Sequence, residues 1–326
     1  METYSIEGVH LMRWGEKRYY SLDYYLKQTY GEKLYKISLD GGMSCPNRDG
    51  KIGTGGCIFC SAGGSGDFAG DRKVSIKQQI QEGKSFLKNK HTGSSYIAYF
   101  QAYTNTYAPA DYLEKIFMEA ICEEDVKILS IATRPDCLSP EILQLLERLN
   151  SLKPVWIELG LQTIHKTSSD FIRRGYELDV FEKAVYDLKK IGISVIVHTI
   201  LFLPNESKEM MLETISYLNT MPIDGIKLQL LHVLEHTDLA HYFREQAFHL
   251  PDLNEYLETL GLLLCHLRPD IVVHRLTGDG PKSILIEPKW TGNKRHVLNS
   301  LQKYFKDFDI WQGKEYSCQN HLHSTN

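Results

Sequence analysis

The feature of this sequence that most restricts its fold is a regular alternation between short apolar segments and longer amphipathic ones. Six β-branched, apolar segments of strand length are separated by stretches with the spacing of surface helices. This alternation predicts parallel strands joined by right-handed crossovers. The predicted strands are Leu34–Leu39, Tyr96–Phe100, Ile128–Ala132, Val155–Leu159, Ser194–Leu203 and Ile226–Leu231, and the predicted helices are Ile76–Asn89, Ala110–Cys122, Glu141–Leu149, Val180–Ile191 and Lys208–Thr220.

Six strand–helix units fit two architectures, an open partial barrel or an open doubly wound sheet. In both, functional residues gather at the carboxyl ends of the strands. We expect residues 15–235 to form this core and residues 236–315 to form a mostly helical extension packed on it, with one strand-like segment at Ile271–Leu276. The polar residues 316–326 are expected to form a flexible tail.

Composition excludes several classes of protein. The chain has 326 residues, of which 42% are hydrophobic, so it can bury a large core. Its net charge of −4 excludes a globally basic nucleic-acid binder, although not a local basic patch. The N-terminus lacks the pattern of a signal peptide, and the longest apolar run, Ile193–Leu203, is too short to span a bilayer. We therefore expect a cytoplasmic protein with no membrane partner, whose thiols stay reduced and available for metal.

Three of the seven cysteines lie in one glycine-rich loop after the first predicted strand. Cys45, Cys57 and Cys60 form the pattern Cys-x11-Cys-x2-Cys. Thiolates are soft ligands for iron–sulfur clusters or zinc, and glycines let the backbone fold around a bulky cluster. Three ligands on a [4Fe–4S] cluster leave one iron open to S-adenosylmethionine, whose reduction yields a carbon radical. We predict this cluster; the alternatives are zinc held by the trio and a histidine, or three ordinary core thiols.

Several stretches around and beyond these cysteines resemble the radical S-adenosylmethionine (SAM) superfamily and, more narrowly, its YhcC/YtqA-type family. The resemblance extends from about residue 15 to residue 315 and implies a partial (β/α)6, TIM-like barrel with SAM across the strand tops. The stretches are CPNRDG (45–50), GGCIFCSAGGSGDFAG (55–70), YIAYFQAYTNTYAP (96–109), IATRPDCL (131–138), WIELGLQT (156–163) and VHRLTGDGP (273–281).

The same resemblance implies a substrate. Gram-positive members of the family act on tRNA and convert the 5-carboxymethylaminomethyl group of the wobble uridine, with or without 2-thiolation, to 5-aminomethyl. A separate tRNA methyltransferase then completes the modification, and an electron donor such as flavodoxin or ferredoxin is implied. Two alternatives stay open: radical chemistry on a small molecule or tetrapyrrole, and a non-catalytic, zinc-stabilised RNA-binding protein.

Four residues are candidate SAM contacts near the strand tops. Phe59 stands where relatives pack an apolar side chain near the adenine, and it would also shield a cluster from water. Gln101 follows the second strand, where it either offers a side-chain acceptor or caps the strand. Gln162 matches a Gly-x-Gln motif of heme-biosynthetic relatives, and Arg174 lies twelve residues later, as their ligand-binding arginine does. An arginine fork suits a carboxylate.

Two further candidates lie inside predicted strands. Glu158 points to the opposite face from its neighbour Leu159 and is expected to line the barrel, since a buried carboxylate without a role is costly. His198 stands where relatives place a ribose contact, although a histidine within a strand is also typical of a core. Near these strand tops the chain departs from the family in two places. Phe202 and Asn205 stand where the family tends toward Gly-Leu-Pro, and His236 stands where Gly-Thr is common.

Two charged groups complete the candidate list. Arg134 and Asp136 close the third strand and either pair with each other or bind an anionic substrate. Residues 281–314 carry a net charge of +4, from seven basic and three acidic residues, with Trp290 and Trp311 interleaved. This pattern suits RNA phosphates and base stacking, but it is also typical of a solvated helix face.

Overall fold

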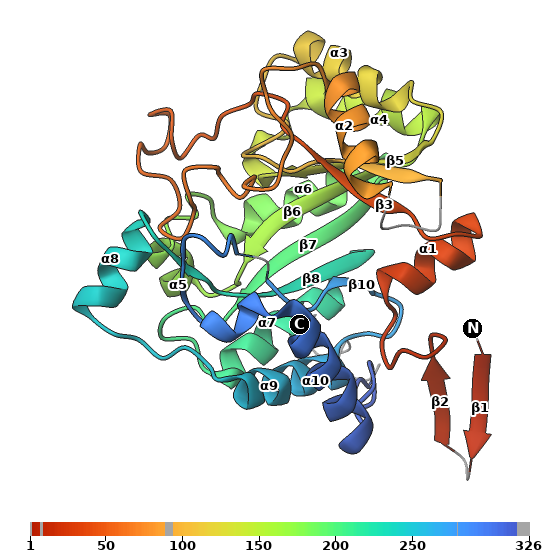
Figure 1. Ribbon diagram of the computed structural model, residues 1–326, viewed down its shortest axis with the longest axis vertical. Coiled ribbons are helices and arrows are strands. Elements are labelled where there is room, and N and C mark those ends of the chain that lie inside the picture. Colours follow the sequence, from red (N-terminus) through yellow and green to blue (C-terminus); the bar gives the residue numbers. More distant parts are fainter. Residues whose placement is uncertain (1, 7–8, 89–93, 279, 318–326) are drawn as a thin grey trace, which may run out of the picture.

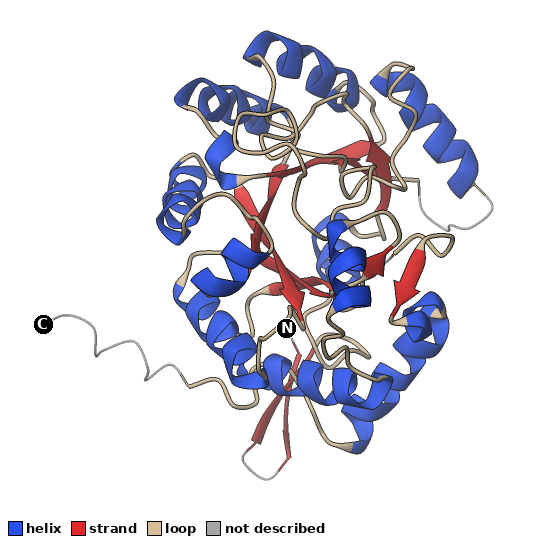
Figure 2. Ribbon diagram, turned by 90° about the vertical axis from the view of Figure 1, so that its left-hand side faces the viewer, coloured by secondary structure: helices blue, strands red, loops and turns tan. Residues whose placement is uncertain are grey.

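The computed structural model describes residues 2–6, 9–88, 94–278 and 280–317. The predicted tail from residue 318 onward and Asn89, the end of a predicted helix, lie outside the described residues. A seven-stranded, all-parallel sheet forms the centre of the molecule and curls into an open half-barrel (Figures 1 and 2). Its strands are β3 (Tyr35–Leu39), β4 (Tyr96–Phe100), β5 (Val126–Thr133), β6 (Val155–Gln162), β7 (Ser194–Leu201), β8 (Gly225–Leu230) and β10 (Val272–Arg275).

The partial barrel implied by the family resemblance is confirmed, and it decides between the two architectures that the alternation left open, because the sheet is curled and helices surround its outer face (Figure 2). Serine hydroxyls cap four of the helices at their N-termini by accepting a backbone N–H. The helices are α1 (Leu22–Tyr30), α2 (Ile76–Leu87), α3 (Ala110–Ile121), α4 (Pro140–Leu152), α5 (Lys166–Phe171), α6 (Leu178–Lys190), α7 (Lys208–Thr220), α8 (Asp238–Glu245), α9 (Leu253–His266) and α10 (Lys294–Asp307).

The sheet has one more strand than the six strand–helix units of the prediction. Strand β10 pairs in parallel with β8, with Val272 beside Gly225 and Val273 beside Ile226, and gives the order β10-β8-β7-β6-β5-β4-β3. The C-terminal region is helical as expected, and α9 packs against α7 while α10 packs against α9. The shorter elements are β1 (Glu2–Ile6) and β2 (Val9–Arg13), which form a hairpin, β9 (Val233–Leu234) and β11 (Leu285–Glu287), which pair with each other, and the 3-10 turns at Pro135–Cys137 and Lys289–Gly292.

The two faces of the sheet bury different residues, because side chains alternate along each strand. Outward residues such as Ile37, Leu129 and Val197 join the main core beneath the helices. Inward residues at the amino ends of the strands form a separate apolar layer, which the side chains of α1 close from below. This layer consists of Leu26, Leu34, Ile97, Ile128, Trp156 and Ile196. None of the helices in the described ranges is long and apolar enough to span a membrane.

Candidate functional site

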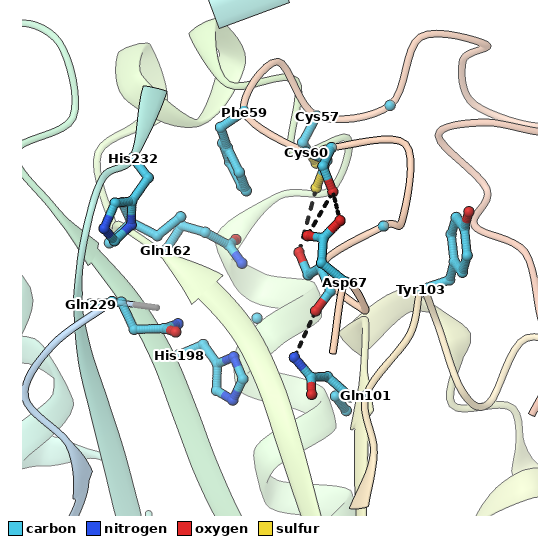
Figure 3. A pocket seen from close by; sticks show the side chains of 18 of the residues that line it. Cys57, Phe59, Cys60, Asp67, Gln101, Tyr103, Gln162, His198, Gln229 and His232 are labelled. Carbon is cyan, nitrogen blue, oxygen red and sulfur yellow. Dashed lines mark hydrogen bonds between the residues drawn. The ribbon is translucent and has the colours of Figure 1, made fainter. Parts of the chain in front are cut away.

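A cavity of about 270 Å³ lies at the carboxyl ends of the strands, between the sheet and the loop that follows β3. Figure 3 shows side chains converging on it from this loop and from the strand ends. Every residue predicted to bind metal or SAM lines this cavity. These residues are Cys45, Cys57, Phe59, Cys60, Gln101, Glu158, Gln162, Arg174 and His198.

The loop that carries the cysteines, residues 41–70, is held in place by backbone contacts and is called the cluster loop below. Arg48 donates from Nη2 to the carbonyl oxygens of Cys60 (3.2 Å) and Ser61 (2.7 Å). Tyr103, just beyond β4, donates its hydroxyl to the Ala62 carbonyl at 2.6 Å and its N–H to the Gly64 carbonyl at 2.9 Å. These hydrogen bonds hold the cluster loop in place beside the carboxyl ends of the strands.

The thiols of this loop have hydrogen-bond partners of the kind that tune an iron–sulfur centre. Asn47 Nδ2 donates to the Cys57 sulfur at 3.4 Å and to the Arg173 carbonyl at 2.7 Å, which ties the loop to the end of α5. The Ser65 hydroxyl lies 3.8 Å from the Cys60 sulfur. A hydrogen bond between Cys57 and Cys60 lowers the pKa of Cys60 and raises that of Cys57.

The thiol trio fits an iron–sulfur cluster better than a single zinc ion. Within the described residues, no group of three or more His, Cys, Asp or Glu is gathered as ligands of one ion. Cys45, Cys57 and Cys60 instead lie around a shared cavity, and no other cysteine lines it. A polynuclear cluster spans a wider set of ligands than one tetrahedral ion, and three thiolates leave one iron open.

The carboxylate of Glu158 anchors a polar layer below the cavity, which we call the barrel floor: Lys36, Tyr99, Ser130, Glu158, His198 and Lys227. One carboxylate oxygen accepts from Lys36 Nζ at 2.8 Å and from the Ser130 hydroxyl at 2.9 Å. The other accepts from His198 Nε2 at 2.7 Å and from Lys227. Four strands other than β6 thus supply one partner each, so the register of the parallel strands brings the residues of the barrel floor together.

Burial and charge set the protonation states in the barrel floor. Burial, with Lys227 nearby, lowers the pKa of His198 to about 4, so this imidazole is neutral near pH 7. Burial alone would raise the pKa of Glu158, but Lys227 and Lys36 outweigh it, and the pKa lies well below its usual value. Burial lowers the pKa of Lys227 against the opposing effect of Glu158. The Tyr99 ring lies between the two lysines, with the Nζ atoms of Lys36 and Lys227 at 4.6 and 4.7 Å from its centroid.

Arg174 and Gln162 sit at the top of β6 in restrained conformations. Arg174 donates from Nη1 to the carbonyl oxygens of Leu161 (3.0 Å) and Thr163 (2.7 Å), and from Nε to that of Tyr176 (3.1 Å). Three of its five N–H groups therefore hold the backbone, and Nη2 is left for a ligand. Gln162 adopts a φ of +63° at a shift in the β6–β7 register, a geometry that turns its side chain toward the cavity (Figure 3).

The two departures from the family pattern have a common backbone explanation. Phe202 and His236 both adopt left-handed conformations, with φ of 61° and 64°. Glycine takes this conformation without strain, which explains why glycine is common there. In this chain Phe202 is buried against the main core, whereas the His236 side chain is exposed.

The remaining sequence candidates have structural partners. Arg134 binds both carboxylate oxygens of Asp136, at 2.9 and 2.8 Å, so these two residues pair with each other. Trp290 is half-buried, donates its indole N–H to the Pro251 carbonyl at 3.1 Å and lies with its ring centroid 5.4 Å from that of Tyr256. The Nζ atom of Lys314 lies 4.6 Å from the ring centroid of Trp311.

Sequence reasoning missed the lysines of the barrel floor. Lys36 and Lys227 are inward residues of strands whose other members are mostly apolar, YKISL and GIKLQL. A charged residue at an inward position of a buried strand is the signal that identifies them, because such a charge needs a partner. Tyr99 and Ser130 carry no comparable signal, since tyrosine and serine are ordinary residues in strands.

Comparison with known proteins identifies the class of this chain. The Radical SAM superfamily matches residues 49–218, and the Radical_SAM C-terminal domain matches residues 223–307. The chain therefore belongs to the radical SAM superfamily and is an enzyme of that class, which works with a [4Fe–4S] cluster and SAM. The alternative of a non-catalytic, zinc-stabilised RNA-binding protein is wrong.

Three individual proteins are similar to this chain to different degrees. The uncharacterized protein YtqA of Bacillus subtilis is 40% identical, over 92% of this chain and 93% of that protein. A tRNA uridine(34) acetyltransferase of Methanocaldococcus jannaschii is 27% identical over 56% of this chain and 33% of that protein. The structure of Elp3 from Methanocaldococcus infernus aligns with 86% of this chain and over 64% of its own length. Its TM-score is 0.64 at 17% sequence identity, which shows a shared fold.

Proposed function

We propose that this enzyme modifies tRNA by converting 5-carboxymethylaminomethyl(-2-thio)uridine at wobble position 34 to 5-aminomethyl(-2-thio)uridine. The observation that carries the proposal is the similarity to a tRNA uridine(34) acetyltransferase, which extends over 56% of this chain. That relative is named for the same nucleotide. The family resemblance of the sequence supplies the particular reaction.

The lining of the cavity gives each predicted residue a role in this proposal. Cys45, Cys57 and Cys60 would hold the cluster, which together with SAM would supply a carbon radical. Phe59 covers the cluster side of the cavity, because its ring packs against a small apolar group that includes Ile58. Exclusion of water from such a cavity would protect a radical from side reactions.

Four polar residues are assigned to SAM itself. Gln101 is held by a bond from its Nε2 to the Ser65 carbonyl at 2.7 Å, which leaves its side-chain oxygen as an acceptor. Arg174 offers its Nη2 group to a carboxylate, and Gln162 and His198 face the same space (Figure 3). Glu158 is assigned an indirect part, since its two oxygens already accept four bonds.

The proposal includes a cytoplasmic setting, a flavodoxin or ferredoxin as electron donor, and transfer of the product to a tRNA methyltransferase. The experiment that tests it is a nucleoside comparison. A strain that lacks the gene is expected to accumulate the 5-carboxymethylaminomethyl nucleoside and to lose the nucleosides that derive from 5-aminomethyluridine. Complementation with the wild-type gene should restore them, whereas the Cys57→Ala variant should not.

The exposed Cys122, at the end of α3, provides the matched control, and its alanine variant should complement normally. Unchanged wobble nucleosides in the deletion strain would refute the proposed substrate. That result would leave the alternative, radical chemistry on a small molecule or tetrapyrrole, as the function to pursue.

A further inference from the structure

The barrel floor carries more positive charge than its own groups neutralise. Two lysines, Lys36 and Lys227, share the single carboxylate of Glu158, while His198 is neutral and Tyr99 is protonated. A surplus charge inside a protein is costly, and here it is relieved either by an anionic ligand or by loss of the Lys227 proton, toward which burial lowers the pKa of this lysine. An anion in the cavity would hold Lys227 in its ammonium form. The floor therefore has the electrostatics of a site that is completed by an anion.

Lys227 is the member of the pair that faces the cavity. Its side chain is 3% exposed, and it lines the cavity, whereas Lys36 does not. The Lys227 ammonium has two partners, the Glu158 carboxylate and the Tyr99 hydroxyl at 3.3 Å. An ammonium has three N–H donors, and the described residues supply no acceptor for the third.

The neighbours of Lys227 in the cavity are also suited to an anion. Gln229, two residues along β8, lines the cavity, and its side-chain oxygen is taken by Arg275 Nη1 at 3.4 Å, which leaves its amide N–H groups as donors. The other carboxylate in the lining, Asp67, belongs to the cluster loop and accepts from the Ser61 hydroxyl at 2.9 and 2.8 Å.

We propose that Lys227 is a specificity-determining residue that binds a carboxylate on the part of the substrate that enters the barrel. The identity of the substrate as a carboxymethylaminomethyl uridine rests on the proposed function above. The charge requirement rests on the barrel floor alone. The enzyme would then discriminate by charge, and an uncharged carboxamide of the same shape would bind weakly.

The test uses the cluster-loaded enzyme with SAM and two anticodon stem-loop oligonucleotides. They differ only at uridine 34, which carries the carboxymethylaminomethyl group or its carboxamide. The wild-type enzyme is expected to bind the carboxylate about tenfold or more tightly, because a charge-assisted hydrogen bond is lost in the carboxamide. Lys227→Met is expected to bind both with equal affinity and to keep its affinity for SAM.

Lys227→Met should fold, because Glu158 retains Lys36, Ser130 and His198 as donors. The matched control is Lys84→Met, which removes a partly buried lysine from an ion pair with Glu123 on the outside of the barrel. This control is expected to keep the wild-type preference. Lys227→Arg, which retains the charge, should keep a preference for the carboxylate.

Three results would overturn the inference: equal binding of both oligonucleotides by the wild type, an unchanged preference in Lys227→Met, or a loss of SAM affinity in that variant. The wild-type comparison decides the charge requirement even where a variant fails to fold. Conversion of the carboxylate oligonucleotide to the 5-aminomethyl product tests the proposed function separately. A charge preference without conversion would refute the reaction and leave the role of Lys227 standing.

Discussion

The buried imidazole of His198 should make the stability of this protein depend on pH in a measurable way. In the folded chain its pKa is lowered from 6.5 to about 4, by burial first and by Lys227 second. The unfolded chain exposes the ring to water and takes up a proton near the usual pKa. Stability from His198 is therefore fully present above about pH 6.5 and is lost as the pH falls from there toward about pH 4.

The size of the effect follows from the two pKa values. Between about pH 7.5 and pH 5 the linkage relation gives a loss of about 2 kcal/mol in the free energy of unfolding. The His198 side chain keeps 19% of its surface exposed to the cavity. Water there reduces the loss, and we expect about 1–2 kcal/mol.

The assay is urea unfolding of the cluster-free protein at these two pH values, for wild type and His198→Gln. Glutamine can still donate to Glu158 but does not titrate. His274, whose pKa burial also holds well below its usual value, contributes to both proteins, so the difference between the two slopes belongs to His198. His241→Gln, on the exposed surface of α8, is the control. Equal slopes in wild type and His198→Gln would refute the assignment of a neutral, buried imidazole.

Two further predictions concern the cluster loop and the barrel floor. Gly64→Ala should lose most bound iron while its circular dichroism stays native, because a Cβ there would lie 2.3 Å from the Tyr103 ring. Gly53→Ala, in the same loop, should keep its iron, because its Cβ would meet its nearest atom, the Asn47 carbonyl oxygen, at an ordinary 3.5 Å; equal iron contents would contradict this. Glu158→Gln should lower the free energy of unfolding by about 3–5 kcal/mol, since it leaves the buried Lys227 and the partly buried Lys36 without an anion. Glu114→Gln, in an exposed pair with Arg148, should cost under about 1 kcal/mol. A small loss in urea unfolding of Glu158→Gln would contradict the charge balance of the floor.

The local sequence pattern correctly predicted the elements whose ends are determined by residues close to them in the chain. Strand β4 and helix α7 occupy the predicted residues, because apolar periodicity and a capping serine before α7 mark their ends. The cysteine spacing likewise placed three thiols in one loop, since the trio spans only sixteen residues. In the structure, all residues predicted to bind metal or SAM line one cavity, because the carboxyl ends of parallel strands lie at the same edge of the sheet.

Features that depend on contacts between residues far apart in the chain could not be predicted from the local sequence pattern. Strand β10 joins the sheet at an edge where pairing is decided by contacts between segments some fifty residues apart, Val272 with Gly225. Helix α1 closes the bottom of the barrel with Leu26, which packs into a layer drawn from four strands. The left-handed backbone at Gln162 accompanies a register shift between β6 and β7, and no local sequence signal predicts that shift.

The inward side chains of the half-barrel are arranged in three levels. From bottom to top the inward side chains form an apolar layer, then the barrel floor, then the cavity under the thiols. The apolar layer excludes water from below, so the lysines of the floor cannot be neutralised by solvent on that side. An anion that reaches Lys227 enters through the cavity, into the same space that the thiols line. In the proposal for Lys227, the charge of the floor orients the substrate along the barrel axis, and the strand alternation that built the core also sets the direction in which the substrate points.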